Sequence, residues 1–289
     1  MNVEILVDSA SDLPKEIIEK YKLDPIAIPV ILEEETFFDG KTITPEKLFE
    51  DMKKGVVYKT SQVPPNQYLE RFRQLDENKQ YLYVCFSSGL TKMFETSNIA
   101  LEMIKEEKDL DLVIIDTKCA SMGYGLVALE ALKAAEEGKT REEIIDIVKD
   151  KADKMQHVFT VDNLDYLFRG GRLNKSSAVI GNMLSIKPVL QVDDEGKLYS
   201  YKKVRGNKKL FVEIIETIKE NQIDIENQTV GITHASDMEK VEKIEELMME
   251  ELGVKSFMVS SMGCAIGAHT GPGAISIFFL GKKMGRFEE

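Results

Sequence analysis

The chain has 289 residues, of which 43% are hydrophobic and 30% are charged, and its formal net charge is −12 at pH 7. This length allows two ordinary domains, each with its own core. The acidic charge argues against nucleic acid as a partner, since phosphate backbones select basic surfaces. No apolar run reaches the ~20 residues of a membrane span, and residues 1–5 lack the basic start of a secretion signal, so we expect a cytoplasmic protein.

Strands and helices alternate over the first half of the sequence. Apolar runs predict strands at residues 3–8, 82–86 and 112–116, and another apolar run covers 26–32. Helices are expected after Asp12 and from Thr44 to residue 55, with Asp12 and Thr44 as N-caps, and over 68–75, 92–108 and 121–137. Another helix should begin at Thr140, which can form a capping box with Glu143. This alternation is typical of a parallel sheet with helices on both faces, so we predict an α/β domain over residues 1–153.

The pattern changes after residue 153. A strand at 157–161 and a short helix that ends at Gly170 are followed by two apolar segments, 186–192 and 198–204, around a turn sequence that indicates a hairpin. Helices are then expected at 208–221 and 238–252, and strands at 229–233, 256–260 and 274–280. We predict an α+β domain over residues 154–289, with a mixed or antiparallel sheet and helices on one face. The cleft between the two domains is the expected ligand site.

The loop after the 82–86 strand is rich in hydroxyl groups. In open α/β sheets, ligands bind outside the carboxyl ends of strands, where the next helix turns free N–H groups outward. Gly89 would let the backbone pass close to a ligand, and Ser88 and Thr91 each carry a hydroxyl that can donate and accept. The loop is therefore a candidate site for an anionic oxygen group. An ordinary loop with a Ser or Thr helix cap explains the same residues.

The histidines and cysteines show no metal-ligand spacing, so we predict no metal site. Cys85, Cys119 and Cys264 lie in or beside apolar runs and are expected to be buried free thiols. His269 lies within residues 266–273, where three glycines and a proline predict a tightly specified loop with exposed backbone amides. Both a ligand-binding role and a structural role fit this histidine.

Six segments together resemble the DegV family in their order and spacing. They are residues 8–13, 60–62 and 87–90, Leu164 with Leu167 ahead of 170–172, and then 187–190 and 266–273. The resemblance covers nearly the whole chain. It implies a two-domain bacterial protein that binds a long-chain fatty acid in a buried tunnel between the domains. It also implies that the protein presents the acyl carboxylate to a separate fatty acid kinase, which makes acyl phosphate for phospholipid synthesis.

The resemblance also implies residues of the fatty-acid site. Thr60 and Thr91 resemble the hydroxyl donors to the carboxylate, and His269 resembles the histidine at the same end of the tunnel. Ser61 beside Thr60, with Ser88 and Gly89 in the second loop, completes the expected ligand-binding set.

Partner binding is implied for one basic residue. Arg205 resembles the residue that docks the kinase, although Gly206 and Asn207 follow it where the family often has Thr or a basic residue. A second departure is Lys92, which stands where the family has a glycine and would place a cation near the ligand site.

Two other functions fit the same residues. Ser88 or Thr60 with His269 would suit a hydrolase or a phosphoryl-transfer enzyme, but the sequence supplies no third group to orient the histidine. A carrier of another apolar carboxylate would keep the fold and change the ligand. We expect a carrier without catalytic residues, cofactor or metal, whose partners are a fatty acid and a kinase and whose contact with membranes is at most transient.

Overall fold

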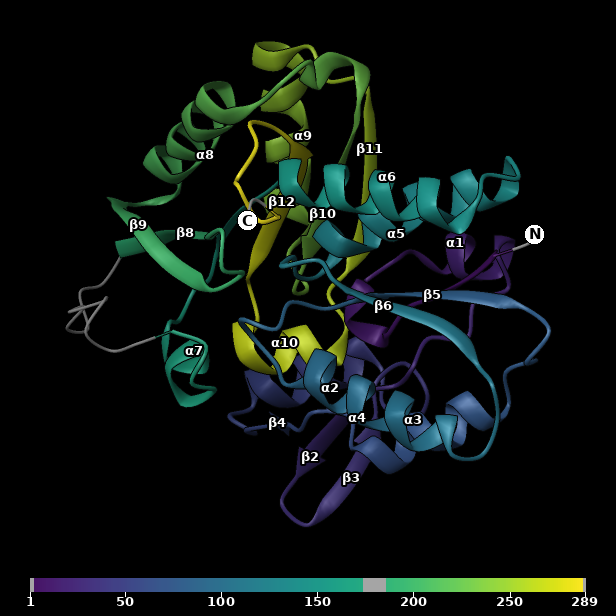
Figure 1. Cartoon of the computed structure of the whole chain (residues 1–289). Coiled ribbons are helices and arrows are strands. Elements are labelled where there is room, and N and C mark those ends of the chain that lie inside the picture. Colours follow the sequence, from purple (N-terminus) through teal and green to yellow (C-terminus); the bar gives the residue numbers. More distant parts are fainter. Residues whose placement is uncertain (1–2, 174–185, 288–289) are drawn as a thin grey trace.

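The computed structural model describes residues 3–173 and 186–287, and its parallel sheet has three strands. These are β1 (Val3–Leu6), β5 (Gln80–Cys85) and β6 (Asp111–Asp116), in the order β1-β5-β6. Helices α3 (Pro65–Arg73) and α4 (Met93–Lys105) lie on one side of this sheet, and α5 (Met122–Glu136) and α6 (Arg141–Lys154) lie on the other (Figure 1). The predicted parallel sheet with helices on both faces is confirmed.

A second, antiparallel sheet in the first half did not follow from the sequence. It contains β2 (Pro29–Leu32), β3 (Glu35–Phe38) and the two-residue strand β4 (Lys59–Thr60), in the order β3-β2-β4. Only β2 was covered by an expected apolar run. The segment of β3 reads as a loop because most of its residues are exposed, so no alternation of buried and exposed side chains marks it. Strand β4 is the element that carries Thr60.

Helix caps were predicted with mixed success. Thr44 accepts a hydrogen bond from a backbone N–H at the start of α2 (Pro45–Lys53), and Thr140 forms the predicted capping box of α6. The prediction for Asp12 is wrong, because α1 (Lys15–Lys20) begins after Pro14. Asp12 instead ends a 3-10 turn at Ser9–Ser11 with φ 48°, and its carboxylate faces a distant segment of the chain.

The second half forms a six-stranded mixed sheet in the order β11-β10-β12-β7-β8-β9. Its strands are β7 (Met155–Thr160), β8 (Ile186–Val192), β9 (Leu198–Arg205), β10 (Thr229–His234), β11 (Ser256–Ser261) and β12 (Ile275–Leu280). Only β10 and β11 pair in parallel; the other neighbours are antiparallel. The predicted mixed sheet is confirmed.

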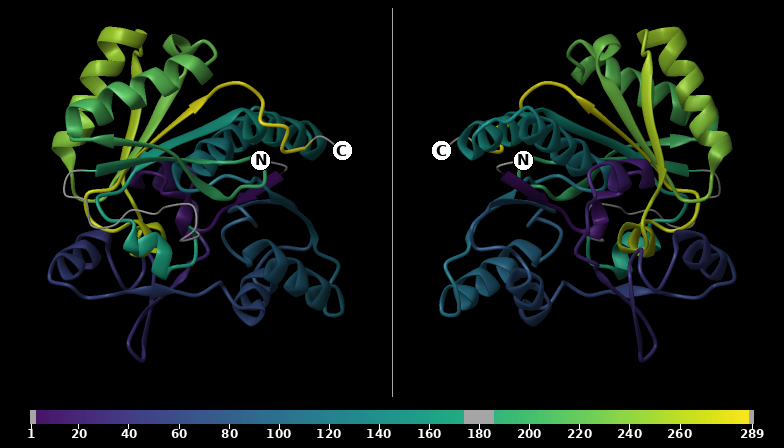
Figure 2. Two further views of the ribbon diagram at one scale, coloured as in Figure 1. Left: turned by 90° about the vertical axis from the view of Figure 1, so that its left-hand side faces the viewer. Right: turned by 90° about the vertical axis from the view of Figure 1, so that its right-hand side faces the viewer.

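Helices cover both faces of this sheet, where the sequence predicted helices on one. Helices α8 (Asn207–Asn221) and α9 (Met238–Leu252) pack on the outer face, as Figure 2 shows. The opposite face packs against α5, which contacts β7, β10 and β12 as well as β1 and β5. Helix α5 is buried almost all round because it lies between two sheets, and its sequence is accordingly apolar on every side.

Two short helices complete the part that positions the site. Helix α7 (Asp165–Arg169) follows β7, and α10 (Cys264–Thr270) lies between β11 and β12. The prediction of a loop over residues 266–273 is wrong for its first half, since α10 continues to Thr270 and only Gly271 onward forms the turn. Helix α10 packs against α2, β2 and β4 of the first half. No helix in residues 3–173 and 186–287 is long and apolar enough to span a membrane.

Candidate functional site

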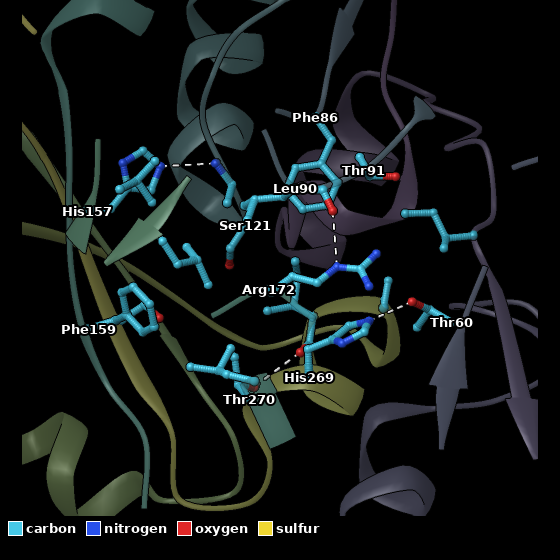
Figure 3. A pocket seen from close by; sticks show the side chains of 18 of the residues that line it. Thr60, Phe86, Leu90, Thr91, Ser121, His157, Phe159, Arg172, His269 and Thr270 are labelled. Atoms are coloured by element: carbon cyan, nitrogen blue, oxygen red, sulfur yellow. Dashed lines mark hydrogen bonds between the residues drawn. The ribbon is translucent and has the colours of Figure 1, made fainter. Parts of the chain in front are cut away.

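A cavity lies where α10, the loops after β5 and β6, and the six-stranded sheet meet (Figure 3). It contains about 760 Å³ of space that atoms do not fill, part of it open to solvent. Both halves of the chain contribute to the walls. The apolar lining residues are Ile28, Phe86, Leu90, Met93, Ala120, Phe159, Leu167, Val192, Leu198, Ala265, Ile266 and Phe278.

Four polar side chains gather at one end of the cavity, which we call the head end (Figure 3). Thr60 comes from β4, Thr91 from the loop before α4, Arg172 from the segment after α7, and His269 from α10. Ser61 also lines the cavity next to Thr60. The structure therefore brings Thr60, Thr91 and His269 together from three separate segments of the chain.

His269 is buried and hydrogen-bonded at the head end. Its Nε2 lies 2.6 Å from Oγ1 of Thr60. Burial, and secondly the charge of Arg172, lowers the pKa of His269 to about 4, so the imidazole is neutral at pH 7. The ring lies so close to Gly170 that a Cβ there would come within 2.1 Å of Nδ1. The absence of a side chain at Gly170 thus allows the ring to occupy this place.

Arg172 supplies the positive charge of the head end. Its Nε donates to the carbonyl oxygen of Leu90 at 3.1 Å, and one terminal nitrogen donates to the carbonyl of Gly170. Burial lowers its pKa below the usual value, yet a guanidinium stays protonated. Within residues 3–173 and 186–287, no carboxylate forms an ion pair with it. A half-buried cation whose partners among the described residues are backbone carbonyls favours an anionic ligand.

The comparisons with known proteins agree with this architecture. The family model for DegV, described as an uncharacterised protein family, matches residues 2–282. The chain belongs to the DegV family. A DegV domain-containing protein of Clostridium perfringens is 34% identical over 281 residues, which cover 96% of this chain and 97% of the relative.

Solved structures of DegV proteins superpose over nearly the whole chain. The structure of a DegV family protein from Thermus thermophilus, described as binding fatty acid, has a TM-score of 0.86 at 26% identity and covers 98% of this chain and 100% of its own. DegV of Bacillus subtilis, described as a fatty acid binding protein, has a TM-score of 0.85 at 28% identity with the same coverage. The predicted family and the predicted α/β fold are both confirmed.

Two expected site residues of this DegV protein lie outside the cavity lining. The Ser88 hydroxyl accepts a hydrogen bond from Lys118 Nζ at 2.9 Å. Gly89 does allow a close backbone approach, but the approaching group is the turn between β8 and β9: a Cβ at Gly89 would lie 2.6 Å from the carbonyl oxygen of Glu195. Gly89 is therefore needed for packing this loop against the hairpin. The sequence correctly predicted a close backbone approach at Gly89, but the group that approaches is the hairpin and not a ligand.

The cation expected near the site comes from a different residue. Lys92 points outward, with 69% of its side chain exposed, and its Nζ lies 2.8 Å from Glu95. Arg172 takes the place at the head end that Lys92 was expected to take. The signal for Arg172 was present in the Gly-Gly-Arg sequence at 170–172, which contributed to the resemblance, but nothing local indicated that its side chain would point inward.

The other end of the cavity has polar residues that the sequence did not indicate. His157 on β7 accepts a hydrogen bond at Nε2 from the backbone N–H of Ala120 at 3.0 Å, and burial holds its pKa well below the usual value. Ser121 has the backbone angles φ 53° and ψ −145°, a combination that is rare for residues other than glycine. Figure 3 shows both residues across the cavity from Thr60. Strain of this kind leaves no mark in a sequence.

The remaining sequence predictions concern cysteines, metal and Arg205. Cys85, Cys119 and Cys264 are buried free thiols, as predicted. No group of three or more His, Cys, Asp or Glu side chains suited to a metal occurs in the described part of the chain. Arg205 is exposed at the end of β9 and does not line the cavity.

Proposed function

We propose that the protein binds a long-chain fatty acid in the cavity, with the carboxylate at the head end. The observation that carries this proposal is that the Arg172 cation and two hydroxyl residues, Thr60 and Thr91, line the same apolar cavity. The DegV proteins of Thermus thermophilus and Bacillus subtilis, both described as binding fatty acid, support it.

The polar groups of the head end can replace the hydrogen bonds that a carboxylate loses when it leaves water. Hydrogen bonds to a charged group contribute about 1.5–3 kcal/mol each, and a guanidinium adds charge. Neutral His269 contributes through Thr60: if Nε2 carries the proton and donates to Thr60, the Thr60 hydroxyl keeps its own proton for the ligand. His269 therefore orients a donor without needing a charge of its own.

The apolar walls account for the acyl chain. Burying a CH₂ group contributes about 0.8 kcal/mol, so a chain of roughly 16 carbons offers on the order of 10 kcal/mol before the costs of association. Aliphatic and aromatic side chains make up more than half of the lining. The cavity thus supplies affinity along the chain, while the head end selects for the carboxylate.

The geometry does not favour the hydrolase alternative. Thr60 and His269 form a hydroxyl–imidazole pair at 2.6 Å, but an imidazole whose pKa is about 4 is a weak base near neutral pH. Its Nδ1 faces the backbone at Gly170, where an enzyme would place a carboxylate to orient the ring. We therefore propose a carrier without catalytic residues of its own.

The head end also reaches the protein surface, which supports a role in presenting the carboxylate. Thr60, Arg172 and His269 line a second, solvent-open depression together with Lys59 and Arg169. Three cations at this depression in an acidic protein suit the approach of a phosphate group. We propose that a separate fatty acid kinase reaches the carboxylate here, that Arg205 helps to dock it, and that the acyl phosphate formed serves phospholipid synthesis.

Native mass spectrometry tests the carrier function. Protein purified from bacteria should retain about one fatty acid per chain, because a ligand enclosed by apolar walls leaves slowly. Delipidated protein should take up added fatty acid and take up the matching fatty alcohol more weakly. A ligand-free mass together with no uptake of fatty acid would refute the proposal. Retention of a different apolar carboxylate would mean that this molecule, and not a fatty acid, is the ligand.

A further inference from the structure

Two buried carboxylates of the first half meet the start of α10, and the proposed function does not use them. Asp12 is 6% and Asp39 is 3% exposed. Oδ1 of Asp12 accepts a hydrogen bond from the backbone N–H of Gly263 at 2.8 Å. The two carboxylate oxygens of Asp39 accept from the N–H groups of Cys264, at 2.8 Å, and Ala265, at 3.1 Å. Three successive backbone N–H groups are thus bound by two side chains.

These contacts join segments that are more than 220 residues apart in sequence. The first N–H groups of any helix lack partners within it, and a helix of seven residues such as α10 has few internal hydrogen bonds to hold it. Its own N-cap, Gly263, has no side chain that could serve. Asp12 and Asp39 therefore cap a helix from across the junction between the two halves.

Gly263 shows how closely the two carboxylates converge. A Cβ at this position would lie 2.8 Å from an oxygen of Asp12 and 3.1 Å from an oxygen of Asp39. Both carboxylates therefore lie on the same side of Gly263 and leave no room for a side chain there. Helix α10 consequently has little freedom to slide or rotate at its start. Asp12 belongs to residues 8–13, one of the segments that resemble the DegV family. These residues do not line the cavity, so the contacts of Asp12 with α10 give this segment a structural role.

Helix α10 carries the parts of the site that depend on its placement. Ala265 and Ile266 line the apolar wall, and His269 reaches Thr60 at the head end. Rotation of an α-helix by one residue turns its side chains through about 100°, so a small error at its start would separate His269 from Thr60.

We propose that Asp12 and Asp39 are positioning residues, which fix α10 so that His269 holds Thr60 ready for the carboxylate of the ligand. The proposal rests on the fatty-acid function for the ligand, but the placement of His269 itself is independent of it. Asp12 extends the same network to the far end of the cavity, since its second oxygen accepts a hydrogen bond from the hydroxyl of the strained Ser121.

The contacts predict different responses to the same substitution. Both oxygens of Asp39 face N–H groups, so an amide at position 39 would turn its own NH₂ toward a donor. One oxygen of Asp12 faces an N–H group and the other faces the Ser121 hydroxyl, which lies 3.2 Å from Thr233 Oγ1. An asparagine at position 12 can accept from Gly263 and donate to Ser121, whose proton then turns to Thr233.

The experiment compares Asp39→Asn with Asp153→Asn as the matched control, because Asp153 on α6 is also a buried carboxylate that accepts a backbone N–H, that of Arg286. Asp39→Asn should weaken fatty-acid binding roughly tenfold and weaken binding of the matching fatty alcohol less. In the ligand-free protein, NMR should show the pKa of His269 moving from about 4 toward the ordinary imidazole value. Asp153→Asn should leave both measurements nearly unchanged, and Asp12→Asn should change them less than Asp39→Asn does.

The proposal is overturned if folded Asp39→Asn protein has a His269 titration that matches the parent, whatever its affinity for the acid and the alcohol. If Asp39→Asn fails to fold, Gly263→Ala takes its place, because the added Cβ displaces both carboxylates without changing charge. If the parent protein binds no fatty acid but Asp39→Asn shifts the His269 titration, the positioning role is supported and the proposed ligand is refuted.

Discussion

At the scale of single residues, the head end combines groups whose chemistry is complementary. Arg172 brings charge, Thr60 and Thr91 bring hydroxyls, and His269 brings a neutral ring that orients one of them. Sequence comparison by motif was enough to indicate the threonines and the histidine. Arg172 emerged only when the direction of its side chain was known, since an arginine beside two glycines is most often a solvated loop residue.

Removing a head-end hydroxyl should affect acids more than alcohols. Thr60→Val or Thr91→Val keeps the shape but leaves a carboxylate without one donor, so fatty-acid binding should weaken by about 1.5–3 kcal/mol. Titration calorimetry with a fatty acid and the matching alcohol measures the difference. Ser88→Ala is the control, because Ser88 lies outside the cavity lining. Equal losses for both ligands would place the carboxylate elsewhere.

Arg172→Gln should weaken fatty-acid binding more strongly. The substitution removes the cation from a half-buried site, and leaving a buried charge unpaired typically costs about 3–5 kcal/mol. Native mass spectrometry of the purified variant should show a largely ligand-free protein. Lys92→Gln, which removes an exposed lysine paired with Glu95, should retain the ligand, and full retention by Arg172→Gln would contradict the assignment.

His269 should make stability depend on pH. Its pKa is about 4 in the folded protein and 6.5 ordinarily, so the unfolded chain binds more protons between these values. The free energy of unfolding should therefore decrease as the pH falls through this window, by on the order of 3 kcal/mol. Burial raises the pKa of Asp39 and acts in the opposite sense, so the test is a comparison with His269→Gln. Urea unfolding of both proteins should show a smaller acid-induced loss for the variant; equal losses would contradict the shift.

At the scale of elements, the site depends on the short helix α10, which other parts of the chain bind at both of its ends. The start of α10 is bound by Asp12 and Asp39, and the turn after it is bound by Lys240, which is 7% exposed and donates to the carbonyl oxygen of Gly273 at 2.7 Å. A seven-residue helix is marginal in isolation. Its stability in this protein therefore comes from tertiary contacts, which is why the sequence reads as a loop.

Gly170→Ala should disturb the site through α7. The added methyl group would overlap with the His269 ring, whose Nδ1 lies 2.1 Å from the position of the new Cβ. Overpacking of this kind typically costs about 1–3 kcal/mol of stability, and the displaced ring should also weaken fatty-acid binding. Thermal unfolding and ligand titration measure the two effects. Gly171→Asn is the control, because no atom of residues 3–173 and 186–287 lies within 4 Å of a Cβ there and asparagine tolerates positive φ. Similar behaviour of the two variants would argue against the steric role of Gly170.

At the scale of the whole molecule, the cavity and the residue proposed to dock a kinase lie in different places. The cavity lies where the two halves of the chain meet, whereas Arg205 is exposed at the end of the edge strand β9. If Arg205 meets an acidic surface of a kinase, repulsion after charge reversal should slow association without changing the cavity.

Arg205→Glu should therefore separate the two functions. We expect unchanged fatty-acid occupancy by native mass spectrometry and a roughly tenfold lower rate of acyl-phosphate formation with the cognate kinase at limiting protein. Lys15→Glu, a charge reversal on the exposed helix α1, is the control. Loss of ligand from Arg205→Glu would mean that Arg205 supports the pocket, and an unchanged phosphorylation rate would exclude it from docking.

The sequence by itself determined the elements whose residues repeat with a regular period, together with the family and its two types of sheet. The apolar run at 82–86 and the capping box at Thr140 are local features, because the apolar character of a strand and the capping of a helix are set by residues close together in sequence. Only the tertiary structure decided that α5 serves two sheets, that Gly89 faces a hairpin, and that Asp12 and Asp39 bind α10. These contacts join distant segments, and a sequence period reports that a face is buried without identifying what lies against it.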